Sequence, residues 1–215
     1  MDPHNTVVRL CAEGMAAEAE GRAVEALALF RRAWDAAGDD YEACVAAHYL
    51  ARHQSTPEDT LHWNRVCLER ADRVGDERVR AFYPSLHATL GRAQAELGAT
   101  REARAHFEAA AARLDDLPPG PYAEWMRLRV AEGLRGTRGG PADPPAADPL
   151  GPFLERLRSR GDLASLALVL PPYLGDTGRS EDAARLTLTL RMLHAERRLP
   201  EREQAELSAI IGARG

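Results

Sequence analysis

The chain has 215 residues, of which 45% are hydrophobic, 6% aromatic and 28% charged, and its formal net charge is -5. That hydrophobic share is enough to bury a core, which excludes a wholly disordered chain. The net negative charge disfavours nucleic acid as a partner, because proteins that bind nucleic acid present a basic surface. Alanine, leucine, glutamate and arginine dominate the sequence, so the composition predicts an all-α protein.

The N-terminus and the cysteines indicate a cytoplasmic protein without membrane association. Residues 1–5 lack the basic and apolar stretches of a signal peptide, and no apolar run reaches the eighteen or so residues that span a bilayer. Cys11, Cys44 and Cys67 each lie in an apolar helical pattern, without the spacing of a metal site. We therefore expect them to be buried free thiols in a reducing compartment.

Two segments of the first half share one pattern of small and aromatic residues. Each has a glycine, an alanine twelve residues later, a phenylalanine four further on and a second alanine after three more: Gly14, Ala26, Phe30 and Ala33, then Gly91, Ala103, Phe107 and Ala110. The alanines and the phenylalanine lie on one face of a second helix, and the glycine lets that helix approach the first closely. We expect Ala26, Ala103 and Ala110 at tight helix contacts.

This spacing resembles the tetratricopeptide repeat (TPR), a helical hairpin of about 34 residues. Leu90 also matches the consensus leucine before the glycine, whereas Glu13 stands there in the first segment and the closing proline is absent from both. The resemblance implies about three antiparallel hairpins in a right-handed solenoid, whose first helices line a concave face. The chain is similar to small stand-alone TPR proteins of GC-rich bacteria.

Between the two matching hairpins the sequence predicts a degenerate one. Its helices are expected over residues 40–54 and 58–74, and Ser55 or Thr56 is expected to cap the second of them. Gly75 is expected to end that helix.

The third hairpin follows an extra helical stretch over 77–83. Pro84 is expected in the first turn of its first helix, and whether the stretch and that helix join into one kinked helix stays open. Its second helix is expected over 100–117, and a further helix over 122–135 is expected to cap the repeats.

The chain therefore divides into a repeat domain over 1–135, a proline- and glycine-rich linker over 136–151 and a small C-terminal helical bundle over 152–215. In the bundle we expect the apolar stretch 163–174 to be broken by its two prolines, Pro171 and Pro172. Ser180 is expected to cap a long helix that follows.

The leucines of the bundle indicate that it docks on the repeat domain. Three short helices are expected to leave part of their surface unburied, including Leu166, Leu170, Leu186 and Leu190. The linker reaches roughly 20 Å by chain statistics. We therefore expect the bundle to pack against the repeats, as an extra cap or in their groove.

Catalytic and cofactor motifs are absent from the sequence. His48, His53, His62 and His87 are close in sequence but lack the i,i+4 spacing of helical metal ligands. No nucleophile elbow, phosphate-binding loop or paired general acid and base occurs. The sequence predicts no enzyme, no metal and no cofactor.

The expected function is to hold a protein or peptide partner on the concave face. By the register that the resemblance implies, His48, Arg52 and Arg92 point into the groove, with Glu18 and Glu96 toward its rim. The arginines are expected to bind carboxylate groups of a bound segment.

Three aromatic residues, Tyr49, Trp63 and Tyr83, are candidate recognition residues, because aromatic side chains dominate binding hot spots. The alternative is that they only fill space left by missing alanines. The chain has no lysine, and Val45 stands near the asparagine place of the middle unit, so the family's carboxylate clamp is incomplete. The alternative function is a structural or regulatory subunit that self-associates, or assembles with an operon-encoded enzyme, through its outer face or C-terminal helices.

Overall fold

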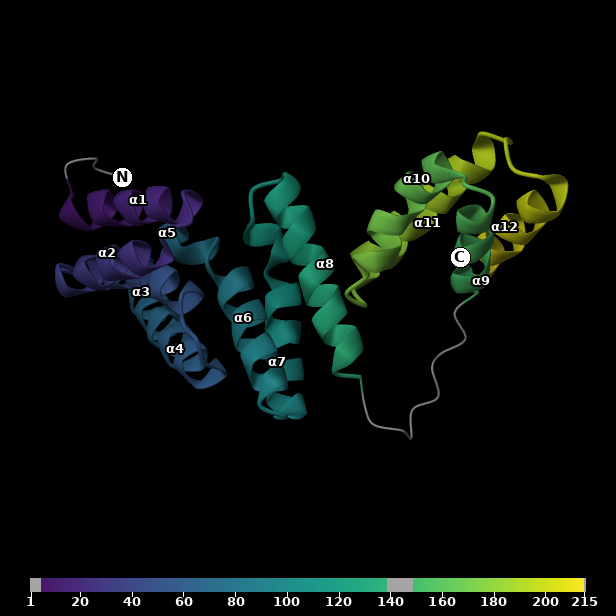
Figure 1. Ribbon diagram of the computed structural model, residues 1–215. Helices are drawn as coiled ribbons and strands as arrows, with labels where there is room; N and C mark the ends of the chain where they lie inside the picture. The colour runs from purple at the N-terminus through teal and green to yellow at the C-terminus, as the bar shows by residue number, and fades with distance from the viewer. Residues whose placement is uncertain (1–4, 139–148, 215) are drawn as a thin grey trace. The chain divides into compact units, whose positions relative to one another are not determined.

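The computed structural model describes residues 5–138 and 149–214, and within these ranges all secondary structure is helical, without strands (Figure 1). The all-α prediction is confirmed. The chain forms two compact units, Met1–Met126 and Arg127–Gly215. Their boundary falls inside a helix that the sequence assigns wholly to the repeat domain, and most of the predicted linker, 139–148, lies outside the described residues.

The first unit contains three pairs of adjacent helices. Its helices are α1 (Thr6–Ala19), α2 (Ala23–Asp35), α3 (Asp40–Arg52), α4 (Pro57–Val74), α5 (Glu77–Arg80), α6 (Tyr83–Glu96), α7 (Thr100–Ala112), the 3₁₀ helix η1 (Leu114–Asp116) and the start of α8 (Pro121–Gly136). Helix α1 packs on α2, α3 on α4 and α6 on α7 (Figure 1). Successive pairs meet where α2 packs on α3 and α4 packs on α6.

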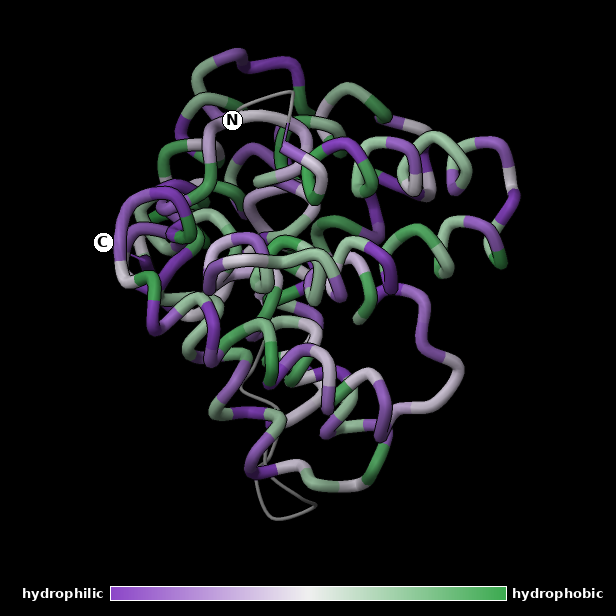
Figure 2. Tube along the Cα trace, turned by 90° about the vertical axis from the view of Figure 1, so that its left-hand side faces the viewer, coloured by the Kyte–Doolittle hydropathy of each residue, from purple (hydrophilic) through white to green (hydrophobic). Residues whose placement is uncertain are grey.

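The helices of both units are amphipathic. Hydrophobic and hydrophilic residues alternate along each turn of the backbone trace (Figure 2). One side of each helix therefore enters a core and the other faces solvent, which is the arrangement that the 3.6-residue period of the sequence favours.

The glycine and phenylalanine of the shared pattern contact each other in both hairpins. A Cβ atom built on Gly14 would lie 2.4 Å from Cε1 of Phe30, and one built on Gly91 would lie 3.0 Å from Cδ1 of Phe107. Phe30 is fully buried and Phe107 is 5% exposed. Glycine lets these helices approach closely, because a Cβ would enter the phenylalanine ring at Gly14 and would crowd it at Gly91.

The predicted tight contacts of Ala26, Ala103 and Ala110 are confirmed, since all three are fully buried. Replacing Ala103 by leucine is expected to lower the free energy of unfolding by about 1–3 kcal/mol, because the added methylenes have no space beside Gly91. A thermal melt of Ala103→Leu measures this loss. Ala105→Leu is the control, because Ala105 lies exposed on the same helix; equal melting of the two variants would contradict the packing.

The middle hairpin ends its helices as the sequence predicts. Thr56 caps α4, its Oγ1 accepting from the backbone N–H of Asp59 at 3.1 Å, with Pro57 in the first turn. Gly75 ends the helix with φ of 63°, in the left-handed region that glycine adopts without strain.

The stretch before the third hairpin forms a separate helix, α5, rather than one kinked helix. Pro84 lies in the first turn of α6 and has no N–H to continue a helical hydrogen-bond ladder from α5. The second helix of this hairpin ends earlier than predicted, at Ala112, and the chain continues through η1.

The turn between α1 and α2 recurs between α6 and α7, and again in the second unit. In each turn a glycine takes a positive φ: 77° at Gly21, 76° at Gly98 and 73° at Gly161. In each, the backbone N–H groups of the residues before, at and after the glycine donate to the same relative carbonyls of the preceding helix. This is the glycine-ended helix motif that joins two helices by a short turn.

The second unit contains the rest of α8 from Arg127, then α9 (Leu150–Ser159), α10 (Leu163–Leu174), α11 (Ser180–Ala195) and α12 (Glu201–Ala213). It has a hydrophobic core of its own, built from residues of α9 to α12 such as Phe153, Leu157 and Leu207. Of the four leucines expected to remain partly unburied, Leu166, Leu186 and Leu190 lie in this core and Leu170 packs against it. That expectation is wrong for Leu166, Leu186 and Leu190, because four helices rather than three surround the core, whereas Leu170 is only partly buried.

Two local expectations for this unit are also wrong. Helix α10 continues through Pro171 and Pro172 to Leu174, although neither proline has an N–H to donate to the carbonyl four residues earlier. The Pro171 carbonyl still accepts from Gly175 N–H at 2.9 Å. Ser180 is the first residue of α11 rather than its cap, and Arg179 at the cap position makes no side-chain cap.

A buried ion pair joins α8 to the start of α11. Arg127 Nη1 lies 2.6 Å from Oδ1 of Asp182, with the two side chains 11% and 2% exposed. The other carboxylate oxygen of Asp182 accepts from the backbone N–H of Thr177 at 3.1 Å and from its hydroxyl. Every lone pair of a buried carboxylate that finds a donor offsets part of its desolvation cost.

Candidate functional site

The first predicted site residues come together between α1 and α3. Arg52 Nη2 lies 2.6 Å from Oε1 of Glu18, and its guanidinium lies 5.8 Å from the ring centroid of Tyr49. Nε2 of His53 lies 3.7 Å from the same Glu18 oxygen, and this atom is buried without a hydrogen-bond partner. The arrangement places two cationic or hydrogen-bonding groups and an aromatic ring around one carboxylate.

His48 lies one helical turn before Arg52 and is half-buried. Its ring meets those of Tyr49 and Phe82 edge to face, with centroids 5.5 and 5.2 Å apart. Burial, together with the charge of Arg52, lowers the pKa of His48 from 6.5 to about 4. His48 is therefore neutral near pH 7, and acts as a packing residue with an aromatic edge.

This burial predicts a pH dependence of the first unit. Above pH 6.5 His48 is neutral in the folded and unfolded chain, whereas between pH 6.5 and 4 only the unfolded chain takes up the proton. Stability therefore falls with falling pH, by roughly 2 kcal/mol between pH 6.5 and 5 at 1.36 kcal/mol per pH unit. Urea titrations at pH 7 and pH 5 measure the loss.

His48→Gln is expected to remove this pH dependence, and His62→Gln is the matched control because His62 lies exposed on α4. The half-buried pair His87 and His106, whose pKa values are lowered chiefly by burial, adds a smaller dependence of the same sign. An unchanged pH dependence in His48→Gln would contradict the burial of a neutral imidazole.

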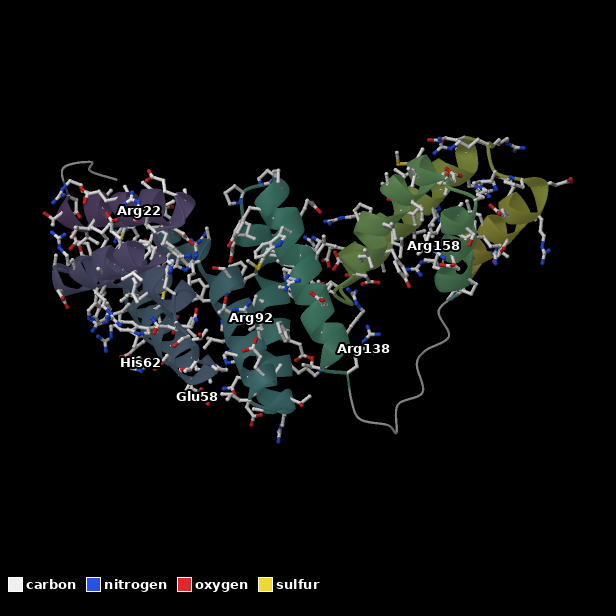
Figure 3. All side chains as sticks on the ribbon, in the orientation of Figure 1. Arg22, Glu58, His62, Arg92, Arg138 and Arg158 are labelled. Atoms are coloured by element: carbon white, nitrogen blue, oxygen red, sulfur yellow. The ribbon has the colours of Figure 1, made fainter. Side chains whose placement is uncertain are left out.

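The second group of predicted site residues lies on α6. Arg92 projects from this helix (Figure 3), and its Nε lies 3.7 Å from Oε1 of Glu96, with side chains 61% and 52% exposed. An exposed pair at this distance is weak, because water screens both charges. Arg92 and Glu96 are therefore open to a partner.

The three predicted recognition aromatics differ in exposure. Tyr49 is half-buried and stacks on Phe30, with centroids 5.0 Å apart, and Trp63 is half-buried edge to face on Trp34 at 5.2 Å. Tyr83 is only 8% exposed, and its hydroxyl donates to Asp72 at 2.8 Å. Burial raises the pKa of Tyr83 to about 12. Tyr83 therefore belongs to the core, while Tyr49 and Trp63 keep an exposed edge.

The three cysteines are buried free thiols, as predicted. Burial raises the pKa of Cys11 to about 11. Cys67 lies against Cys44, with Sγ atoms 3.6 Å apart, and its hydrogen bond to Cys44 raises its pKa well above the ordinary value. Because the thiolate is the reactive form, nucleophilic attack by Cys11 or Cys67 is unfavourable near neutral pH.

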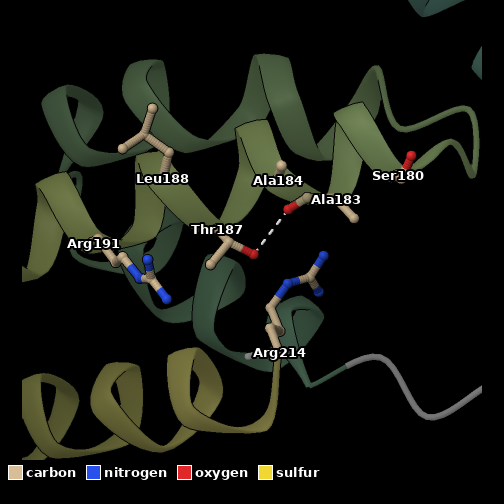
Figure 4. Close-up of a pocket in the computed structure, with 7 residues that line it drawn as sticks. All are labelled: Ser180, Ala183, Ala184, Thr187, Leu188, Arg191 and Arg214. Atoms are coloured by element: carbon tan, nitrogen blue, oxygen red, sulfur yellow. Dashed lines mark hydrogen bonds between the residues drawn. The ribbon is translucent and has the colours of Figure 1, made fainter.

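The second unit has a surface hollow that the sequence does not predict. It has a volume of about 520 Å³ and lies along α11 beside the end of α12 (Figure 4). Its lining residues are Ser180, Ala183, Ala184, Thr187, Leu188, Arg191 and Arg214. The signal for it in the sequence is weak, because these residues read as the ordinary solvent-facing side of an amphipathic helix.

Within residues 5–138 and 149–214, no cluster of three or more histidine, cysteine, aspartate or glutamate side chains is placed to hold a metal ion. Across the same described ranges, none of the helices combines the length and apolar character needed to cross a membrane. Comparison with protein-family models, with curated proteins and with solved structures finds no match for this chain.

Proposed function

We propose that the first unit is a TPR-like solenoid that binds a polypeptide segment on the face formed by α1, α3 and α6. The contact that carries the proposal is the glycine–phenylalanine packing, which occurs in two hairpins 77 residues apart. The two hairpins also share the same glycine turn. Repetition of one packing unit is the mark of a solenoid, and solenoids present extended binding surfaces.

The charged groups on this face suit a partner that carries carboxylates. Arg52 is paired with Glu18 and Arg92 with Glu96, and both glutamates are partly exposed. Each guanidinium keeps further N–H groups besides the one that faces its glutamate. Exposed pairs of this kind contribute about 0–1 kcal/mol, so a ligand carboxylate can replace the glutamate at little cost. Tyr49 beside Arg52 supplies an aromatic contact for the same segment.

The test begins with capture of partners by the whole chain from its native host. For a captured polypeptide, Arg52→Ala and Arg92→Ala are each expected to weaken binding about tenfold, the loss of a charge-assisted hydrogen bond. Arg101→Ala is the control, because Arg101 is exposed on α7, a second helix. Calorimetric titration measures the affinities. A partner that binds the variant carrying both Arg52→Ala and Arg92→Ala as tightly as the wild type contradicts the proposal.

The second candidate function is a subunit that assembles through its C-terminal helices, with itself or with an enzyme. One observation favours it: Leu188 and Met192, one helical turn apart on α11, are 60% and 52% exposed. Large exposed apolar side chains that adjoin each other mark interaction surfaces. Sedimentation velocity over a range of concentrations decides whether the chain associates with itself.

A further inference from the structure

The polar groups around the hollow on α11 are mainly hydrogen-bond donors. Arg191 approaches it from α11 and Arg214 from the end of α12 (Figure 4). Nε of Arg214 is buried and has no hydrogen-bond partner. The hydroxyl of Thr187 already donates to the Ala183 carbonyl at 2.8 Å. An occupant must therefore supply acceptors, and two guanidinium groups favour carboxylates, whose two oxygens match the guanidinium fork.

No carboxylate lines the hollow among its described residues. The two acidic residues next to its lining residues in sequence have partners elsewhere: Glu181 lies 3.5 Å from Arg179, and Asp182 lies 2.6 Å from Arg127. A buried guanidinium N–H without an acceptor is costly in the free protein. The guanidinium groups of Arg191 and Arg214 both line the hollow and supply the donors that an anionic group there needs.

The apolar part of the surface extends beyond the hollow. Leu188 lies on the side of α11 away from Arg214 (Figure 4), and Met192, which is 52% exposed, stands four residues later on the same helix. A small inorganic anion would satisfy the arginines but leave Leu188 and Met192 in water. A polypeptide segment with acidic and apolar side chains covers both, and gains about 25 cal/mol for each Å² of apolar surface removed from water.

We infer that this hollow is a binding site for an acidic, amphipathic segment of another protein, which places a carboxylate between Arg191 and Arg214 and an apolar side chain against Leu188. The site lies wholly in the second unit and does not depend on the proposed function of the first. A second copy of this chain is a poor occupant. In a symmetric contact, Arg191 and Arg214 of one copy would face the same two arginines of the other copy, and like charges repel.

The experiment titrates the isotope-labelled full chain with a peptide of alanine, leucine and glutamate, about 15 residues long so that it can form a helix when bound. The backbone amides of α11 and the end of α12 are expected to shift. A peptide with glutamine in place of glutamate, and inorganic phosphate alone, are expected to bind about tenfold more weakly, since each lacks one half of the recognition.

Variants locate the binding. Arg191→Ala and Arg214→Ala are each expected to weaken the peptide about fivefold, and Leu188→Ala to weaken the peptide but not phosphate. Arg185→Ala is the matched control, because Arg185 is exposed on the same helix and does not line the hollow. Circular dichroism checks that each variant folds.

Four outcomes overturn the inference. They are the absence of binding, equal binding of the glutamine peptide, phosphate binding as tight as that of the peptide, and a loss in Arg185→Ala as large as in Arg191→Ala. A dimer in sedimentation that Leu188→Ala dissociates also overturns it, since the occupant is then a second copy. If this inference fails, the proposed function of the first unit is unaffected, because that function is tested with variants of Arg52 and Arg92.

Discussion

Replacing Asp182 by alanine is expected to lower the free energy of unfolding of the second unit by about 3–5 kcal/mol, because it leaves the guanidinium of Arg127 buried without its carboxylate. The N–H and hydroxyl of Thr177 lose their acceptor as well. Hydrogen exchange of α10 and α11 measures the loss. Tryptophan fluorescence should change little, because all three tryptophans of the chain, at positions 34, 63 and 125, lie in the first unit.

The control is Glu132→Ala on α8, the helix of Arg127, because the exposed pair of Glu132 with Arg129 is expected to contribute nothing measurable. The double variant Arg127→Met with Asp182→Leu is expected to recover most of the stability, because it removes the buried guanidinium together with its carboxylate. If Asp182→Ala were as stable as Glu132→Ala, the buried pair would not hold α8 against α11.

Replacing Phe30 by alanine is expected to destabilise the first unit by about 3–5 kcal/mol. The ring is fully buried, packs against Gly14 and stacks on Tyr49, so its removal leaves a cavity that rigid helices cannot close. Urea unfolding followed by tryptophan fluorescence measures this loss. Val24→Ala is the control, because Val24 lies on the same helix and is 86% exposed.

The pair Gly14 and Phe30 also allows a test of coupling. Gly14→Ala alone gains helix propensity of about 1 kcal/mol, but its Cβ would lie 2.4 Å from the Phe30 ring, and we expect a net loss. In the Phe30→Leu background the same change is expected to cost less, because a smaller side chain can move aside. Additive effects of the two changes would contradict direct contact.

Much of the first unit could be predicted because its determinants are local. Thr56 before Pro57 marks the start of a helix, Gly75 its end, and glycine with phenylalanine at fixed spacing marks two helices in close contact. Each of these depends on residues within one hairpin. The predicted site followed from the same register, and Glu18 and Arg52 do meet between α1 and α3.

The rest of the site could not be predicted, because burial depends on what the neighbouring helices place against a residue. Tyr83 and Tyr49 look alike in the sequence, yet Tyr83 is core and donates to Asp72, while Tyr49 keeps an exposed edge. Burial lowers the pKa of His48, and part of its surroundings is the ring of Phe82, which comes from the chain before α6.

The sequence by itself determined the helical class, the helix ends marked by Thr56, Gly75 and Pro84, and the two equivalent hairpins, since helix propensity, caps and short-range packing are properties of neighbouring residues. Only the tertiary structure decided which residues of the second unit form a core. Gly14 and Gly91 each stand seven residues before the glycine of their turn. In the second unit Leu154 occupies that position, so the glycine–phenylalanine pattern that marks the turn in the first unit is absent there. The pairing of Arg127 with Asp182 and the hollow beside Arg214 arise from contacts across dozens of residues, and no local pattern encodes a contact of that range.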